Sequence, residues 1–373
     1  MGKSAKPTAH AAILRDIAAP LTIEPVLLGE IAPGEIQVRL VATGICHTDL
    51  IVIAGMLPVP RPVILGHEGA GIVEVVGSAV SHLAPGDHVV LSFGSCGDCP
   101  ACASCTPSYC VEFTSRNFSC ARPDGTTGID ASERIHTHFF SQSSFSSQIL
   151  CPARNAIKMP KEIGLAGLAP LGCGILTGAG AILNALKVTA GASVAIIGAG
   201  AVGLSAVMAC VLVGATSIVV VDRITDRLML AAEFGATGTI DTSSVALEEA
   251  FDAVKASGFD YVLDTSGVPF LIETAIRALA IRGKLGLVAP GPDFTMPVMS
   301  LIGGGREVRG IIEGDADPAE LLPRLLAWHR EGIFPFDRMI RFYPFDKINE
   351  AIADAVAGTV IKPVLRFDDY SAL

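Results

Sequence analysis

The sequence predicts an α/β protein of two domains, one with a doubly wound parallel sheet and the other mainly antiparallel β. Its 373 residues exceed what one compact core usually holds. Residues 1–150 alternate short apolar runs with turns, whereas the chain from residue 191 alternates strand-like and helix-like segments. Half of the residues are hydrophobic and 17% are charged, which fits large buried cores and excludes disorder.

The N-terminal part has the pattern of antiparallel β structure. Its apolar runs at residues 36–42, 71–76 and 87–91 are separated by turns, with Pro-Gly pairs at 33–34 and 85–86. Short apolar runs bounded by turn residues are typical of strands. We therefore expect antiparallel strands here, and mixed α and β elements again in the tail after residue 313.

The central part has the pattern of a parallel sheet with connecting helices. Strand-like and helix-like runs follow one another at residues 193–197, 204–213, 218–222, 261–264, 271–280 and 284–288. Such alternation predicts a parallel α/β sheet. An amphipathic helix is expected later, near residues 318–328.

The charge and the N-terminus exclude some partners. A formal net charge of −10 argues against nucleic acid, whose phosphates need a basic face. The first residues contain no apolar core of signal-peptide length, and the longer apolar runs are too short to span a bilayer. We therefore expect a cytoplasmic protein with no membrane partner. Cysteines stay reduced there, so a tight cysteine cluster indicates a metal more often than a disulfide.

A glycine motif lies directly between a predicted strand and a predicted helix. It consists of Gly198, Gly200 and Gly203, with Val202 before the last glycine. Glycines let the backbone approach a pyrophosphate, and the helix N-terminus supplies free N–H groups and a positive dipole end. Asp222 ends the next strand 19 residues after Gly203, where a carboxylate can accept hydrogen bonds from an adenosine ribose.

The residues around Asp222 bear on the choice of dinucleotide. Its carboxylate would repel a 2′-phosphate, so the sequence favours NAD over NADP. Arg223 leaves the strictness of this preference open, because an arginine there can lean toward a phosphate. Arg227 is a second candidate contact to the ribose, with a solvated helix charge as an equal alternative.

Four cysteines have the spacing of a closed zinc site. The pattern C-x2-C-x2-C-x7-C is formed by Cys96, Cys99, Cys102 and Cys110. Short spacings let neighbouring thiolates face one metal, and the longer loop brings the fourth round. Cys105 is surplus: it is either a free thiol or a competitor of Cys110, and the longer spacing favours Cys110.

Two further cysteines and a histidine are candidates for an open metal site: Cys46, His67 and Cys173. A Cys2His set leaves zinc one position for an alcohol oxygen. Each residue alone also has an ordinary explanation, because small buried cysteines and turn histidines are common. Spacing alone leaves both explanations open.

The motifs together resemble the zinc-dependent alcohol dehydrogenases of the medium-chain dehydrogenase/reductase superfamily. The likeness runs over essentially the whole chain and includes, in order, Cys46-His-Thr-Asp49, Gly66-His-Glu-Gly-Ala-Gly71, the four-cysteine lobe, Gly172-Cys-Gly-Ile-Leu-Thr177-Gly and the glycine motif. The resemblance implies a GroES-like catalytic domain over residues 1–175 and 313–373, and a Rossmann coenzyme domain over residues 176–312. It also implies NAD and two zinc ions per subunit, one catalytic and one structural.

The resemblance assigns roles to single residues. Cys46, His67 and Cys173 would hold the catalytic zinc, so that a zinc-bound alkoxide passes hydride to the nicotinamide. Asp49 matches the carboxylate that orients His67. Glu68 matches the acidic residue behind the zinc, and its alternative role is an ion pair with a buried arginine near Lys362 in the C-terminal tail.

Thr48 matches the hydroxyl that takes the alcohol proton. In many relatives a histidine three residues later completes the proton relay, but this chain has Ile51 there, so water or His47 is left as the acceptor. The resemblance also matches contacts to the coenzyme pyrophosphate and nicotinamide: His47, Lys362, Thr177 and Val202.

Apolar residues are expected to line the substrate pocket: Phe93, Met56, Leu57, Phe139 and Phe140. Apolar walls bind by burial without demanding a polar group, although ordinary core packing is the alternative for each phenylalanine. Residues 139–145 and the tail resemble the benzyl (aryl) alcohol dehydrogenase branch, which includes enzymes for allylic alcohols such as geraniol. We therefore expect reversible oxidation of an aryl or allylic primary alcohol to its aldehyde.

Other functions stay open. One is a general aliphatic alcohol dehydrogenase, and another is a glutathione-dependent formaldehyde dehydrogenase, which needs polar residues that the stretch 54–60 lacks. A non-catalytic nucleotide-binding relative is disfavoured because the zinc ligands and Thr48 are all present. The family forms homodimers and homotetramers through its coenzyme domains, and residues 283–290 and 296–302 are candidates for that contact.

Overall fold

The computed structural model describes residues 8–255 and 257–368. Residues 1–7 and 369–373, the two ends of the predicted catalytic domain, lie outside the described residues. The chain divides into two compact units. The first comprises Met1–Cys173, Asp317–Pro323 and Asp337–Leu373, and the second comprises Gly174–Ala316 and Arg324–Phe336. Residues 324–336 group with the second unit, because that is where their contacts are concentrated.

The first unit contains two β-sheets. A seven-stranded sheet has the order β16-β17-β3-β5-β6-β9 with β8 also paired to β3, and a four-stranded sheet has the order β4-β1-β2-β7. All pairs are antiparallel except β16 with β17. The strands are β1 (Thr8–Leu14), β2 (Thr22–Leu28), β3 (Glu35–Gly44), β4 (Val63–Ile64), β5 (Gly69–Val76), β6 (His88–Leu91), β7 (Ile129–Asp130), β8 (Gln148–Pro152), β9 (Ala156–Met159), β16 (Ile340–Pro344) and β17 (Lys362–Arg366). The mainly antiparallel character expected from the sequence is confirmed.

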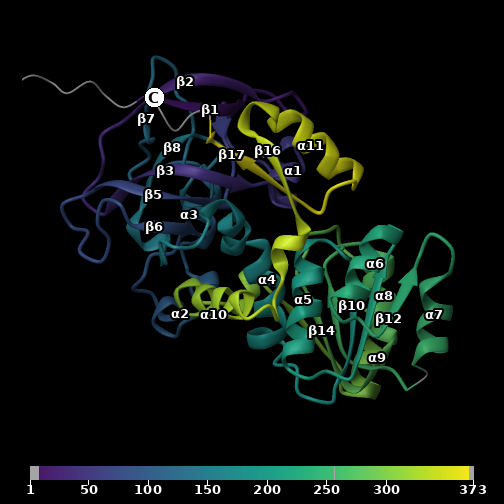
Figure 1. Cartoon of the computed structure of the whole chain (residues 1–373). Coiled ribbons are helices and arrows are strands. Elements are labelled where there is room, and N and C mark those ends of the chain that lie inside the picture. Colours follow the sequence, from purple (N-terminus) through teal and green to yellow (C-terminus); the bar gives the residue numbers. More distant parts are fainter. Residues whose placement is uncertain (1–7, 256, 369–373) are drawn as a thin grey trace, which may run out of the picture. The chain divides into compact units, whose positions relative to one another are not determined.

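Strand β3 is the centre of the larger sheet. It pairs with β5, β8 and β17, and most of its residues are buried, which fits its run of apolar side chains. Figure 1 shows β17 in yellow beside β3 in purple, so the C-terminal tail completes the sheet begun near the N-terminus. Short helices connect the strands: α1 (His47–Ile53), α2 (Pro100–Ala103), α3 (Phe113–Phe118) and α11 (Ile348–Ala357).

The second unit contains a six-stranded parallel sheet. Its order β12-β11-β10-β13-β14-β15 is that of the doubly wound dinucleotide-binding fold. The strands are β10 (Ser193–Ile197), β11 (Ser217–Asp222), β12 (Gly238–Asp241), β13 (Phe259–Asp264), β14 (Leu279–Leu287) and β15 (Glu307–Gly310). The helices are α4 (Gly174–Gly180), α5 (Ala201–Leu212), α6 (Thr225–Glu233), α7 (Leu247–Val254), α8 (Pro269–Arg277) and α9 (Val298–Gly304). The parallel sheet expected from the sequence is confirmed.

Helix α10 (Pro318–Arg330) is the amphipathic helix expected near residues 318–328, and the division between the units falls within it. Over the described part of the chain no single helix has the length and apolar character needed to cross a membrane. Two consecutive helices, residues 165–172 and 174–185, would together be long and apolar enough to cross a membrane, but the chain is bent by 55° between them.

Candidate active site

The register of β3 and β5 brings Cys46 and His67 together. Thr43 lies opposite Gly69, so the end of β3 and the start of β5 are neighbours in an antiparallel pair. Cys46 follows β3 by two residues and caps α1, and His67 precedes β5 by two residues. A pairing fixed within one sheet therefore determines the distance between two residues that are 21 positions apart in sequence.

Cys173 completes the set of three ligands. It follows the 3-10 segment η4 (Leu165–Gly172), which is anchored where Ser92 Oγ donates to Gly172 O at 2.6 Å. The Sγ atoms of Cys46 and Cys173 are 4.0 Å apart, and these sulfurs and a ring nitrogen of His67 all lie within 4.8 Å of one another. Two sulfurs on one tetrahedral zinc, with Zn–S bonds of about 2.3 Å, would lie roughly 3.8 Å apart. The spacing therefore fits a zinc ion.

Asp49 holds this set from the side of α1. It is fully buried, and its carboxylate accepts hydrogen bonds from Cys46 N at 2.9 Å and Gly66 N at 3.1 Å. The same carboxylate lies 3.1 Å from His67 Nδ1. This contact fixes the ring and its tautomer, so that Nε2 is the atom offered to a metal. His67 Nε2 is buried and has no hydrogen-bond partner among the residues that the structure describes, as expected for a metal ligand.

The electrostatics of the site favour a bound cation. Burial opposes charge on the imidazole, but Asp49 and the sulfur of Cys46 outweigh it and raise the pKa of His67 well above its ordinary value. The hydrogen bond from the Cys173 thiol lowers the pKa of Cys46 well below its ordinary value, with help from the charges of His67 and Lys362 and against the effect of burial. Zinc bound at Nε2 would take the place of the proton that these surroundings stabilise.

Glu68 and Lys362 form a buried ion pair directly behind the ligands. Lys362 Nζ donates to Glu68 Oε1 at 2.9 Å, to Glu68 Oε2 at 3.0 Å and to Ile45 O at 3.2 Å. A Cβ on Gly44 would collide with the Glu68 carboxylate, so only glycine fits at the end of β3. Glu68 thus has a buried ion-pair partner in the C-terminal tail, as its alternative role required, but the partner is Lys362 and not a neighbouring arginine.

This ion pair occupies the ammonium group of Lys362. An ammonium group has three N–H donors, and all three are directed at acceptors within the unit. Lys362 is also only 3% exposed. Lys362 is thus engaged within the first unit, and the pyrophosphate contact expected for it stays a prediction.

Helix α1 carries the predicted proton-transfer residues. Thr48 is half-buried and His47 is exposed. The Cys46 sulfur lies 4.0 Å from Thr48 Oγ1, so the hydroxyl lies next to a metal ligand. Ile51 lies one turn after Thr48 and is buried, which places an apolar side chain where relatives carry the next relay group.

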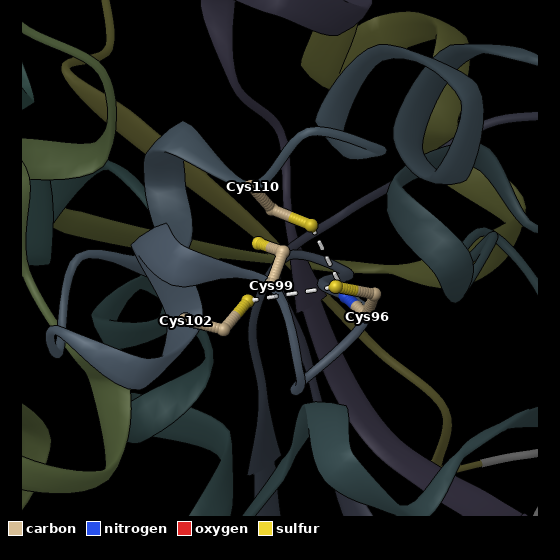
Figure 2. Close-up of side chains that lie close together, drawn as sticks. All are labelled: Cys96, Cys99, Cys102 and Cys110. Carbon is tan, nitrogen blue, oxygen red and sulfur yellow. Dashed lines mark hydrogen bonds between the residues drawn. The ribbon is translucent and has the colours of Figure 1, made fainter.

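The structure brings the four predicted cysteines of the lobe together (Figure 2). The sulfurs of Cys96, Cys99, Cys102 and Cys110 all lie within 4.8 Å of one another. Backbone N–H groups of Cys102 and Val111 lower the pKa of Cys99 to about 6, which favours the thiolate form that binds metal. Cys105 is exposed and does not belong to the group. The geometry therefore selects Cys110 over Cys105 as the fourth member.

The glycine turn of the second unit has the form expected of a pyrophosphate-binding loop. A Cβ on Gly203 would collide with the carbonyl oxygen of Gly198, so α5 can start this close to β10 only with glycine there. Asp222, at the end of β11, accepts hydrogen bonds from Ala199 N at 2.6 Å and Arg223 N at 2.7 Å. Its carboxylate thus lies beside the turn, as predicted for a ribose-binding residue.

Three other predicted coenzyme residues lie in the same unit, whereas His47 and Lys362 belong to the first unit. Arg227, on α6, is partly buried, and burial lowers its pKa although Asp222 opposes this. Val202 begins α5 and Thr177 lies in α4, where its hydroxyl donates to Glu313 Oε2 at 3.2 Å. Glu313 was not singled out from the sequence, because nothing there pairs residues so far apart.

Aromatic rings surround His67. Phe140 is stacked on its ring with centroids 4.4 Å apart, and Phe139 meets it edge-on at 5.6 Å. Phe118, which the sequence did not single out, contacts both phenylalanines. Phe139 is fully buried, which fits the core-packing alternative, and its place in the pocket wall stays a prediction.

The remaining pocket candidates lie in different surroundings. Phe93 is 5% exposed and contacts Phe113 at 5.7 Å, whereas Met56 is 71% exposed in the turn after α1. Leu57 is half-buried beside it. Gln142 was also missed from the sequence: it is buried against the backbone of His67, and a glutamine within a serine-rich stretch carries no signal of that contact.

These features define a class of protein. The first unit is GroES-like and carries an open Cys2His set and a four-cysteine lobe, and the second unit carries a dinucleotide-binding sheet. Together these are the parts of a zinc-type dehydrogenase. The alcohol dehydrogenase GroES-like domain family matches residues 32–161, and the zinc-binding dehydrogenase family matches residues 201–328. The chain therefore belongs to the zinc-dependent medium-chain alcohol dehydrogenases and is an alcohol dehydrogenase.

Individual relatives place it more closely. The geraniol dehydrogenase of Castellaniella defragrans is 44% identical over 366 residues, which are 96% of this chain and 98% of that protein. A zinc-binding-domain alcohol dehydrogenase protein of Burkholderia ambifaria has a solved structure that is 47% identical, with a TM-score of 0.94 over 97% of this chain and 99% of that one. The benzyl alcohol dehydrogenase structure from Acinetobacter calcoaceticus is 40% identical, with a TM-score of 0.93 over 96% of this chain and 99% of that one.

Proposed function

We propose that the protein catalyses the NAD-linked, reversible oxidation of hydrophobic primary alcohols, aryl or allylic, to aldehydes. The observation that carries the proposal is the unpartnered, buried Nε2 of His67 beside two cysteine sulfurs, with the ring of Phe140 stacked on the imidazole. A metal site for an alcohol oxygen and an apolar aromatic surface thus occur together. The geraniol and benzyl alcohol dehydrogenases among its relatives support this substrate class.

We assign the metal ligands as follows. Cys46, His67 and Cys173 would hold one zinc ion and leave one position open, while the four-cysteine lobe would hold a second, structural zinc. Zinc at the open site supplies a Lewis acid that lowers the pKa of an alcohol hydroxyl. Asp49 orients His67 and keeps its Nδ1 occupied, so that Nε2 remains the ligand atom.

The proton and hydride steps involve different residues. Thr48 would accept the alcohol proton at Oγ1, and the proton would leave through water or the exposed His47, because Ile51 cannot carry it further. NAD supplies the hydride acceptor. Asp222 supports NAD over NADP because its carboxylate lies at the glycine turn, where it would repel a 2′-phosphate, while Arg227 would contact the ribose.

We further propose that a second copy of the chain covers the outer edge of the parallel sheet. Strand β15 is the edge strand, and none of the residues of the neighbouring α9 is buried. Met299 is 79% exposed and Ile302 is 70% exposed, so apolar surface is available to a partner. A homodimer or homotetramer in the cytoplasm, where the ten thiols stay reduced, is the expected form, and light scattering on the eluted protein measures it.

Steady-state kinetics test the substrate class. The zinc-loaded protein is assayed for NADH formation with benzyl alcohol, geraniol and ethanol, and with S-hydroxymethylglutathione as a fourth substrate. We expect kcat/KM for benzyl alcohol or geraniol to exceed that for ethanol by at least about tenfold, since each buried CH2 contributes about 0.8 kcal/mol. Equal or faster ethanol oxidation would indicate a general aliphatic enzyme, and preference for the glutathione adduct would indicate a formaldehyde dehydrogenase.

A further inference from the structure

A buried glutamine contacts the backbone of the zinc-ligand histidine and of the glycine two residues after it. Gln142 lies between the 3-10 segment η2 (Phe139–Ser141) and β8, and it is 1% exposed. Its amide nitrogen donates to His67 O at 2.9 Å and to Ser92 O at 3.1 Å. Its amide oxygen accepts from Gly69 N at 3.1 Å. Both N–H donors and the oxygen are therefore used, and only this orientation of the amide satisfies two carbonyls and one N–H.

The same glutamine is connected to the segment of another ligand. Ser92, whose carbonyl Gln142 contacts, donates its own Oγ to Gly172 O at 2.6 Å. Gly172 directly precedes Cys173. The side chain of Gln142 thus links the backbone of His67, through Ser92, to the residue before Cys173.

The loop that carries Gln142 is strained. Phe140, Ser141 and Ser143 have φ values of 50°, 54° and 54°, in the left-handed region that side chains disfavour. Such strain persists only where the surroundings hold it, and it is frequent at functional sites. Here the loop is held by Ser143 Oγ, which donates to Ile64 O at 2.6 Å, and by Ser144 N, which donates to Gly66 O at 2.9 Å. This conformation places Phe140 on the ring of His67.

We propose that Gln142 is a positioning residue for the catalytic metal site. It sets the position of His67 directly and that of Cys173 through Ser92, so that the ligands are already in place when zinc binds. Partners that orient metal ligands typically change metal affinity or activity about 10- to 100-fold when they are removed. The proposal rests on the zinc site assigned above to Cys46, His67 and Cys173.

The test compares two buried amides in the same unit. Gln142→Met keeps the length of the side chain and removes all three hydrogen bonds. The control is Asn117→Leu: Asn117 is fully buried and also makes three backbone hydrogen bonds, to Gly94 N, Gly94 O and Phe113 O, none of them to a segment of the open site. Both variants should lose stability to a similar degree, and only Gln142→Met should weaken the open metal site.

Metal binding is measured on the whole protein without relying on activity. Zinc per chain is recorded against increasing chelator, and Co2+ is then exchanged into the weaker site, where its visible absorption reports the ligand geometry. We expect Gln142→Met to weaken one of the two sites about 10- to 100-fold and to shift the cobalt spectrum. Asn117→Leu should leave that site's affinity and spectrum as in the wild type.

The possible results distinguish a failure of the role proposed for Gln142 from a failure of the open zinc site. Unchanged affinity and spectrum in Gln142→Met, or an equal loss in Asn117→Leu, would overturn the role of Gln142. A wild-type protein that holds zinc only at the four-cysteine lobe would overturn the open site instead. If Gln142→Met does not fold, Gln142→Glu is used, which keeps the acceptor for Gly69 N but removes both donors. It should weaken the same site, and wild-type affinity in it would also refute the proposal.

Discussion

Replacing Lys362 by methionine removes the cation from a fully buried ion pair while keeping most of the apolar volume. Lys362 is 3% exposed and Glu68 is 0% exposed. The variant loses three hydrogen bonds and leaves the Glu68 carboxylate without its cation. Removing one partner of a buried pair typically costs about 3–5 kcal/mol, most of it from the charge left behind. We therefore expect the Tm of the first unit to fall by something on the order of 10 °C.

The pH dependence of this loss has a definite sign. Burial raises the pKa of Glu68 above its ordinary value of 4.5, and Lys362 opposes that rise. Without Lys362 the folded protein binds the Glu68 proton more tightly than the unfolded chain does. The stability of the variant should therefore be highest below about pH 4.5 and should fall as the pH rises.

Unfolding in urea, with zinc in excess, measures both effects between pH 5 and pH 8. The double variant Glu68→Gln/Lys362→Met carries neither charge, so it should recover much of the stability lost in Lys362→Met. A loss below about 1 kcal/mol in the single variant would refute the reasoning, because such a value is typical of an exposed pair. A double variant less stable than Lys362→Met would refute it as well.

Three further predictions follow from other parts of the chain. Ile51→His should extend the proton relay by one group and raise turnover at lower pH, and an unchanged pH–rate profile would count against a truncated relay. Asp222→Asn removes the charge and can keep an acceptor for Ala199 N, although its NH2 group can no longer accept from Arg223 N and Ile224 N. The kcat/KM preference for NAD over NADP should fall about tenfold, and an unchanged ratio would mean that another residue selects the coenzyme. Burial alone would raise the pKa of Glu35, but hydrogen bonds from His138 and Arg122 outweigh this effect and lower the pKa to about 2. The ionised Glu35 should therefore contribute about 3 kcal/mol to the free energy of unfolding above pH 4.5, and this contribution should be lost as the pH falls toward 2. Glu35→Gln should remove that part of the acid slope in urea unfolding, and wild-type acid sensitivity in the variant would exclude the assignment.

The parallel sheet was predictable because its strands and helices differ strongly in their apolar patterns. The run at 193–197 is β10 without change, whereas helix α8 ends at Arg277, earlier than expected, because β14 begins at Leu279. The two-residue strands β4 and β7 could not be predicted, since such short pairs carry no periodicity. Their positions depend on pairing with β1 and β2.

The grouping of the candidate metal ligands was predictable for a different reason. Cysteine and histidine are rare and chemically specific, so their spacing and context carry information even before the fold is known. The residues that support them carry no such signal. Lys362 pairs with Glu68 because β17 joins β3, and Gln142 reaches His67 because a strained loop turns its side chain inward. Contacts of this kind between distant segments exist only in the folded chain.

Zinc content measured together with activity tests the account most directly. The wild type, Cys173→Ser and Cys105→Ser are each analysed for zinc per chain and for NADH formation with benzyl alcohol. We expect two zinc ions and activity in the wild type and in Cys105→Ser, because Cys105 is exposed and outside both cysteine groups. Cys173→Ser should retain one zinc ion and lose activity. Oxidation at the wild-type rate by Cys173→Ser, or a fully active wild type with a single zinc ion, would contradict the assignment of Cys46, His67 and Cys173 as the catalytic zinc site.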